Sequence, residues 1–140
     1  LLGKLVTVLG WGLADTATSW YYPAILRQVS LPVVADSSCN DIYSNPVLPS
    51  QFCAGYYEGK DACEGDSGGP AVVQVDGAWV HAGIVSAGVP CREYFGWYGK
   101  YTRTSAHLAF IRQSVPNVAV TGKIPAGATL PAVNLLLLTP

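Results

Sequence analysis

The chain has 140 residues, of which half are hydrophobic and 12% are charged, and its formal net charge at pH 7 is -1. This length suits one ordinary domain rather than two. The apolar content excludes disorder over most of the chain, and the sparse charge leaves no basic patch for nucleic acid. No uncharged apolar run reaches the roughly 18 residues that span a bilayer.

The N-terminal part favours short strands separated by turns. Residues 5–9 (LVTVL) predict a strand that Gly10-Trp11-Gly12 ends, and residues 13–23 predict a surface loop. Alternating apolar residues predict a second strand over 29–33. Pro32 within it indicates an edge strand or a position that donates no hydrogen bond.

A short helix and a brief strand follow. Asp36-Ser37-Ser38 can cap a helix that runs to about Tyr43. Asn45-Pro46 and Pro49 then break the chain. Residues 51–55 predict a strand that ends in a glycine loop.

The clearest local signal is a hairpin. Residues 71–75 and 78–85 flank Asp76-Gly77, a pair that tolerates the positive φ angles of a type I′ turn. A further strand is expected within 96–104. Five or six short strands with one terminal helix predict a small all-β barrel.

The C-terminal part predicts one helix, followed by a segment of different composition. Ser105 can cap the helix, an apolar face is formed by Leu108, Ile111 and Val115, and Pro116 ends it. We therefore expect a domain over 1–116 and a linker or tail over 117–140.

The four cysteines are Cys39, Cys53, Cys63 and Cys91. Because no two of them form a C-x-x-C pair, zinc and thioredoxin-type sites are disfavoured. Two disulfides in an extracellular protein are the better interpretation, and the sequence alone leaves three pairings open.

The segment Asp61-Ala62-Cys63-Glu64-Gly65-Asp66-Ser67-Gly68-Gly69-Pro70 carries the chemical signal. Its glycines allow backbone N–H groups to converge on one point, which is the arrangement of an oxyanion hole. Ser67 at that point is a candidate nucleophile. A glycine-rich turn with capping Ser and Asp residues is the alternative for a shorter pattern of this kind.

This segment resembles the active-site segment of the chymotrypsin/trypsin family of serine endopeptidases. The resemblance covers about residues 3–115 and includes further segments in the family's order: 6–12 (VTVLGWG), 52–55 (FCAG), 83–86 (GIVS) and 101–103 (YTR). It implies a six-stranded antiparallel Greek-key barrel, the second barrel of the family's two, with a C-terminal helix.

The resemblance also implies roles for single residues. Ser67 matches the nucleophile, and the N–H groups of Gly65 and Ser67 match the oxyanion hole. Asp66 matches the carboxylate that accepts the new N-terminal ammonium on zymogen activation. Asp61 matches the base of the primary specificity pocket, which implies cleavage after Arg or Lys.

Other positions match the surroundings of that pocket. The matching residues are Ala62 and Glu64 beside Asp61, Ser86 on the substrate-pairing strand, and Gly88 and Gly99, which keep the pocket open. The family's pairing implies the disulfides Cys39–Cys53 and Cys63–Cys91.

The family's base histidine and its orienting aspartate match nothing in this chain. The two histidines are His81 and His107, and we expect both to have packing or surface roles. We therefore expect a fragment or one chain of a processed enzyme, catalytically ineffective by itself because a serine without a base is a weak nucleophile.

The function predicted from the sequence is a secreted serine endopeptidase that forms an acyl-enzyme at Ser67. The alternative is a non-catalytic half-barrel that binds basic side chains as a decoy module. Expected partners are Arg- or Lys-containing polypeptides, the missing N-terminal barrel and protein protease inhibitors, but no nucleic acid. We expect no cofactor and no metal ligands, and we expect Tyr98 to pack rather than to mark a sodium site.

Overall fold

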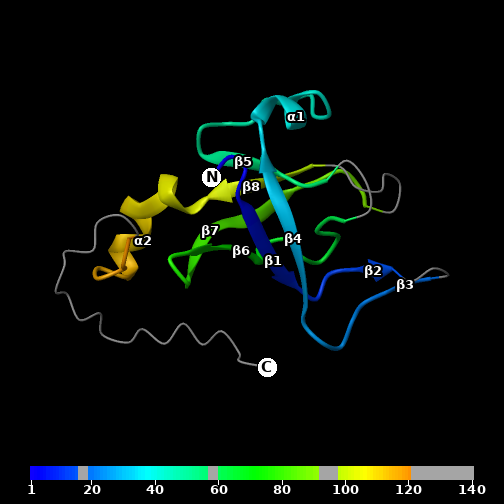
Figure 1. Cartoon of the computed structure of the whole chain (residues 1–140), viewed down its shortest axis with the longest axis horizontal. Coiled ribbons are helices and arrows are strands. Elements are labelled where there is room, and N and C mark those ends of the chain that lie inside the picture. Colours follow the sequence, from blue (N-terminus) through cyan, green and yellow to red (C-terminus); the bar gives the residue numbers. More distant parts are fainter. Residues whose placement is uncertain (16–18, 57–59, 92–97, 121–140) are drawn as a thin grey trace. The chain divides into compact units, whose positions relative to one another are not determined.

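Six antiparallel strands close into a barrel in the order β1, β4, β5, β8, β7, β6 (Figure 1). The structure, a computed structural model, describes residues 1–15, 19–56, 60–91 and 98–120. The barrel strands are β1 (Leu5–Gly10), β4 (Arg27–Val34), β5 (Gln51–Ala54), β6 (Pro70–Val75), β7 (Ala78–Ala87) and β8 (Gly99–Arg103). This architecture confirms the predicted six-stranded all-β barrel.

The barrel closes because alternate residues of each strand are apolar and point inward. In β1, Val6 and Val8 are almost completely buried, and β4 lies antiparallel to them with Leu31 facing Val6. Phe52 of β5 and Tyr101 of β8 are partners on neighbouring strands, and their rings stack with their centroids 5.2 Å apart. These side chains belong to one continuous core that fixes the register of the strands.

The hairpin predicted around Asp76-Gly77 is confirmed. Strands β6 and β7 pair antiparallel from Val75 and Ala78 outward. Asp76 has φ 50° and Gly77 has φ 81°, as a type I′ turn requires. The hairpin brings the segment that precedes β6 against the far end of β7.

Two local expectations in this part of the chain need correction. The predicted loop 13–23 contains a small ladder of β2 (Ala14–Asp15) and β3 (Trp20–Tyr21). Helix α1 (Asp36–Asn40) begins at Asp36, and its N-cap is Ala35, which makes no side-chain capping bond. Asp36 thus lies in the first helical turn, where its charge suits the helix dipole.

Pro32 does not mark an edge strand, because a closed barrel has no edge. β4 pairs with β1 on one side and with β5 on the other. The ladder to β5 begins only at Val33, while the Pro32 carbonyl accepts a bond from the Gly55 N–H at 3.0 Å. The other interpretation, a position that donates no hydrogen bond, is the right one.

The C-terminal part forms a second unit. The chain divides into two compact units, Leu1–Leu108 and Ala109–Pro140. The 3₁₀ helix η1 (Thr104–His107) leads into α2 (Leu108–Ser114), so Ser105 lies inside η1 rather than at a cap, and Arg103 is the N-cap. Most of the predicted tail, residues 121–140, lies outside the described residues.

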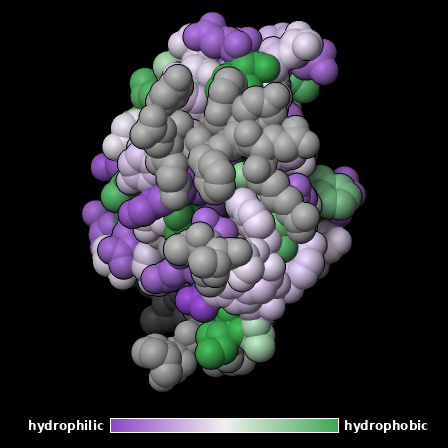
Figure 2. Space-filling view, turned by 90° about the vertical axis from the view of Figure 1, so that its right-hand side faces the viewer, coloured by the Kyte–Doolittle hydropathy of each residue, from purple (hydrophilic) through white to green (hydrophobic). Residues whose placement is uncertain are grey.

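Figure 2 shows hydrophobic residues as separate small groups among hydrophilic and intermediate ones on the face that it presents. The coloured residues on that face therefore make no single continuous apolar surface. None of the helices in the described part of the chain is long and apolar enough to cross a membrane.

Gly83 occupies a position in β7 where the barrel tolerates no side chain. A Cβ there would lie 2.5 Å from Phe52 Cε1 and 2.7 Å from the Thr102 carbonyl oxygen. We expect Gly83→Ala to destabilise the fold by about 2 kcal/mol, because neither the Thr102 backbone nor the stacked Phe52 ring can move away without losing other contacts. Calorimetric melting measures this, with Gly88→Ala, whose Cβ would meet no atom within 4 Å, as the control. Equal melting temperatures for the two variants would contradict this account of Gly83.

Candidate active site

Ser67 lies in a tight turn directly before β6. The turn is closed by bonds from the Asp66 N–H to the Cys63 carbonyl at 3.0 Å and from the Gly69 N–H to the Asp66 carbonyl at 2.9 Å. β7 holds its far side, because the Gly68 N–H donates to the Val85 carbonyl at 2.9 Å. The serine is thus exposed on a short loop that leads into β6 and is hydrogen-bonded to β7.

Two glycines give this turn its shape. Gly65 has φ 97° and Gly68 has φ 82°, values that residues with a side chain rarely adopt. The Glu64 carbonyl accepts a bond from the Leu13 N–H at 2.8 Å. Because the peptide between Glu64 and Gly65 is trans and planar, the Gly65 N–H points in the opposite direction, away from Leu13.

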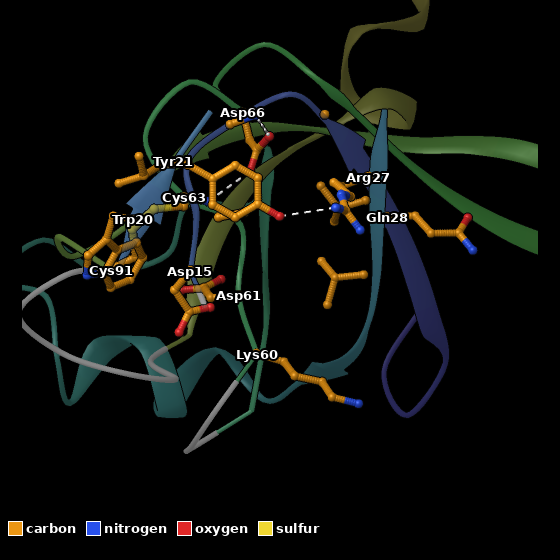
Figure 3. Close-up of a pocket in the computed structure, with 16 residues that line it drawn as sticks. Asp15, Trp20, Tyr21, Arg27, Gln28, Lys60, Asp61, Cys63, Asp66 and Cys91 are labelled. Carbon is orange, nitrogen blue, oxygen red and sulfur yellow. Dashed lines mark hydrogen bonds between the residues drawn. A yellow bond between two sulfur atoms is a disulfide. The ribbon is translucent and has the colours of Figure 1, made fainter. Parts of the chain in front are cut away.

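Two backbone N–H groups hold the carboxylate of Asp66. Its Oδ1 accepts a bond from the Gly12 N–H at 2.7 Å and its Oδ2 accepts one from the Cys63 N–H at 2.9 Å (Figure 3). A Cβ at Gly10 or Gly12 would overlap this carboxylate. Asp66 is also on the wall of a cavity of about 310 Å³, where Tyr21 and Arg27 share a 3.1 Å hydrogen bond.

A second cavity, of about 190 Å³, joins Ser67 to most of the predicted pocket residues. We call it the specificity cavity. Its wall includes Asp61, Ala62, Glu64, Ser67, Gly88, Gly99, the two half-cystines Cys63 and Cys91, and Tyr101. The predicted site residues Gly65 and Asp66 do not line this cavity. Of the residues predicted to surround the pocket, the structure brings all but one together. Ser86 lies on β7 between Val85 and Ala87, which do line the cavity, but it is not a lining residue itself.

The glycines are suited to keeping this cavity open. A Cβ at Gly88 would enter space that holds no other atom within 4 Å. At Gly99 it would lie 3.3 Å from the Tyr101 ring. Any larger side chain at either position would fill the cavity or press on its wall.

The carboxyl group of Asp61 is an unusually weak acid. Burial raises its pKa to about 7; the hydrogen bond from the Ala62 N–H at 2.7 Å opposes this rise, and the charge of Asp66 adds to it. A partly buried anion without an ion-pair partner among the described residues attracts a cation, because binding relieves the cost of its partial burial. The cavity is therefore chemically suited to a guanidinium or ammonium group.

Tyr101 is a cavity residue that sequence reasoning assigned only to a strand. Its side chain is fully buried, and its hydroxyl has no hydrogen-bond partner among the described residues. Burial and the nearby charge of Asp61 raise the pKa of this phenol, so it remains a neutral donor. The alternation of side chains along β8 could have indicated its inward position, but nothing in the sequence indicates that Tyr101 lines the cavity.

Both disulfides have the predicted pairing. Cys39 joins Cys53, with Cα atoms 6.0 Å apart, and Cys63 joins Cys91, with Cα atoms 5.6 Å apart. Within the described ranges, the one cluster of three candidate metal ligands is Cys63, Glu64 and Cys91. Because both sulfurs are in a disulfide, they are not thiolate ligands, and this cluster is no metal centre.

Neither histidine is on the wall of the specificity cavity as the structure describes it. The His81 Nδ1 lies 2.7 Å from the Thr104 hydroxyl, and burial lowers the pKa of the ring. His107 ends η1. The residues that the structure describes on the wall of this cavity thus include no histidine.

Comparison with known proteins agrees with this geometry. The family profile described as Trypsin matches residues 2–111. Clotting factor C of Tachypleus tridentatus is 42% identical over 125 residues, covering 81% of this chain and 12% of its own length. Trypsin-1 of Astacus astacus is 41% identical over 109 residues, covering 76% of this chain and 45% of its own.

Serine protease filzig of Drosophila melanogaster is 38% identical over 117 residues, covering 79% of this chain and 7% of its own. The chain thus spans less than half the length of each of these curated relatives. The family profile nevertheless covers most of the barrel. The chain belongs to the chymotrypsin/trypsin family of serine proteases.

Proposed function

We propose that this chain is the serine-bearing part of an endopeptidase that cleaves peptide bonds after Arg or Lys. The observation that carries the proposal is that Ser67 and Asp61 lie on the wall of one narrow cavity. A basic side chain held by Asp61 leaves its own carbonyl near the mouth, where Ser67 is exposed. Membership of the family supports the reaction class, and the buried carboxyl supports the side-chain preference.

In the proposed reaction, Ser67 Oγ attacks the carbonyl carbon after the basic residue. The serine proton passes to a histidine in another part of the complete protein, and that histidine then protonates the leaving amine. The negative oxygen of the intermediate rests on the N–H groups of Gly65 and Ser67, for which the orientation of the Gly65 peptide is suitable. Water then attacks the acyl-enzyme and restores the serine.

Asp66 is proposed to accept an ammonium group in the 310 Å³ cavity on its far side. Its carboxylate already holds the turn through Gly12 and Cys63. A cation there would strengthen this arrangement and fix Gly65 in the orientation that an oxyanion needs.

The partners proposed for the complete protein are polypeptides with exposed Arg or Lys, an N-terminal barrel that supplies the base, and protein protease inhibitors. The two disulfides support an extracellular location, because such bonds persist in oxidising compartments.

A panel of peptide substrates tests the proposal directly. The native protein that contains this chain is expected to cleave Arg and Lys substrates at least about 10³-fold faster than Phe or Glu substrates, because only a cation compensates Asp61. The isolated 140-residue chain is expected to be at least about 10³-fold slower than the native protein. Equal rates for basic and aromatic substrates would contradict the proposed specificity. Binding of basic peptides without cleavage by the native protein would favour the decoy module.

The weak acidity of Asp61 predicts a pH dependence of binding. Below its pKa of about 7 the carboxyl is neutral and does not attract a cation. The affinity for benzamidine, which stays cationic, is expected to rise by up to about tenfold per pH unit toward pH 7 and to level off above it. Isothermal titration between pH 5.5 and 9 measures this, with Asp61→Asn as the control that lacks the dependence. A constant affinity between pH 6 and 8 would contradict it.

A further inference from the structure

Lys100 is a buried cation on the strand that forms one wall of the specificity cavity. It lies in β8 between Gly99 and Tyr101, both of which line that cavity. Because side chains alternate along a strand, Lys100 points to the opposite face of β8 from the Tyr101 ring. Its side chain is only 6% exposed.

The ammonium group has two partners behind the cavity. Lys100 Nζ donates to the Asn45 carbonyl and lies 4.5 Å from the centroid of the Tyr43 ring. No carboxylate of the described residues forms an ion pair with it. A buried ammonium with this little compensation costs more than an apolar side chain of the same length, so core packing does not explain a lysine here.

The same segment is attached to the cavity wall at a second point. The Tyr43 hydroxyl donates to the Tyr98 carbonyl at 2.7 Å. Residues 43–45 are therefore tied to residues 98–100 by one bond on each side of Gly99. In addition, burial first and the charge of Asp61 second raise the pKa of the Tyr43 phenol.

We propose that Lys100 is a positioning residue for the specificity pocket, which acts by clamping residues 43–45 to the start of β8 and so fixing the wall at Gly99. This inference rests on the proposed function, because it concerns the site where Asp61 receives a basic side chain. Lys100 itself touches no substrate, since its ammonium faces away from the cavity. It acts through Tyr43, the Tyr98 carbonyl and the backbone of Gly99.

The test compares Lys100→Met, which keeps the length and removes the charge, with Lys100→Arg, which restores a cation. The native protein is used, and Lys4→Met, at an exposed lysine, is the matched control. Three readouts are taken: the Ki of benzamidine, which needs only the cavity; the rate at which a fluorophosphonate labels Ser67, which does not need the cavity; and the melting temperature.

Lys100→Met is expected to raise the Ki of benzamidine about tenfold, or about 1.4 kcal/mol, and to raise KM for Arg substrates similarly. The labelling rate of Ser67 is expected to stay within about twofold, because the Lys100 side chain points to the face of β8 opposite the Tyr101 ring that lines the cavity. Lys100→Arg is expected to restore most of the affinity, and Lys4→Met to change none of these quantities.

A lower melting temperature with an unchanged Ki would overturn the inference and leave Lys100 a structural residue. Parallel losses in Ki and labelling rate would also overturn it. If Lys100→Met does not fold, Tyr43→Phe is tested instead, because it removes only the hydrogen bond from the Tyr43 hydroxyl to the Tyr98 carbonyl. The inference then requires that Tyr43→Phe also raises the Ki of benzamidine. Wild-type protein that labels at Ser67 but does not bind benzamidine would instead contradict the proposed specificity, whatever the variants do.

Discussion

Replacing Ser67 with alanine is expected to lower kcat/KM of the native protein toward an Arg substrate by about 10⁴-fold or more. The reason is that Ser67 is the only serine, threonine or free cysteine among the residues that the structure describes on the wall of the specificity cavity. The binding of benzamidine is expected to be unchanged, because Asp61 and the cavity wall remain. Steady-state kinetics and a competition titration measure the two effects on one preparation.

The matched control is Ser37→Ala, an exposed serine of α1 outside both cavities. It is expected to keep full activity and full affinity. Residual activity of Ser67→Ala above about 1% of the wild type, after contamination is excluded by active-site titration, would show that Ser67 is not the nucleophile. Equal loss of benzamidine affinity would show that the substitution deforms the cavity instead.

Asp61→Asn is expected to have the second largest effect, with opposite consequences for activity and for stability. The amide keeps the shape of the side chain but loses the charge that attracts a guanidinium group. We expect kcat/KM for Arg and Lys substrates to fall about 10³-fold, because breaking a buried charge pair costs about 3–5 kcal/mol. Cleavage after uncharged residues is expected to change little.

The same substitution is expected to stabilise the fold at alkaline pH. Burial raises the pKa of Asp61 in the folded protein to about 7, whereas an unfolded chain has a value near 3.9. The folded state therefore holds the proton longer, and stability is lost as the pH rises from about 4 to 7. Asn avoids this loss, so we expect a gain on the order of 2–4 kcal/mol at pH 8 and none at pH 4.

Melting temperatures at pH 4 and pH 8 measure this difference. The control is Asp41→Asn, an exposed carboxylate after α1, which is expected to show no such contrast. An Asp61→Asn variant that is no more stable than the wild type at pH 8 would contradict a buried, weakly acidic Asp61. Retention of the Arg preference would contradict its role in specificity.

The barrel was predictable because its signals are local. Apolar alternation over residues 5–9 and 29–33, together with the Asp76-Gly77 turn, indicates strands and a hairpin without knowledge of distant contacts. The helix starts were less accurate. Asp36 and Ser105 have side chains that cap helices well, but neither is an N-cap. The observed N-cap lies one residue before Asp36 in α1 and two residues before Ser105 in η1.

The candidate site was predictable only where the family resemblance reached it. That resemblance places Ser67, Asp61 and Gly99 near one pocket, and the structure puts them on one cavity wall. The Lys100 clamp has no such signal, because a lysine in a strand pattern reads as a solvent-facing residue. Its burial depends on segment 43–45, which lies more than fifty residues away in the chain.

The central claim is that Ser67 is an activated nucleophile in the complete protein. The measurement that tests it most directly is labelling of native protein with a fluorophosphonate, followed by peptide mapping and the intact mass of the labelled species. The account predicts a label on the Ser67 peptide in a species larger than the 14.8 kDa of this chain, and no label in the isolated chain. An unmodified Ser67 peptide recovered from folded, mature native protein would contradict it.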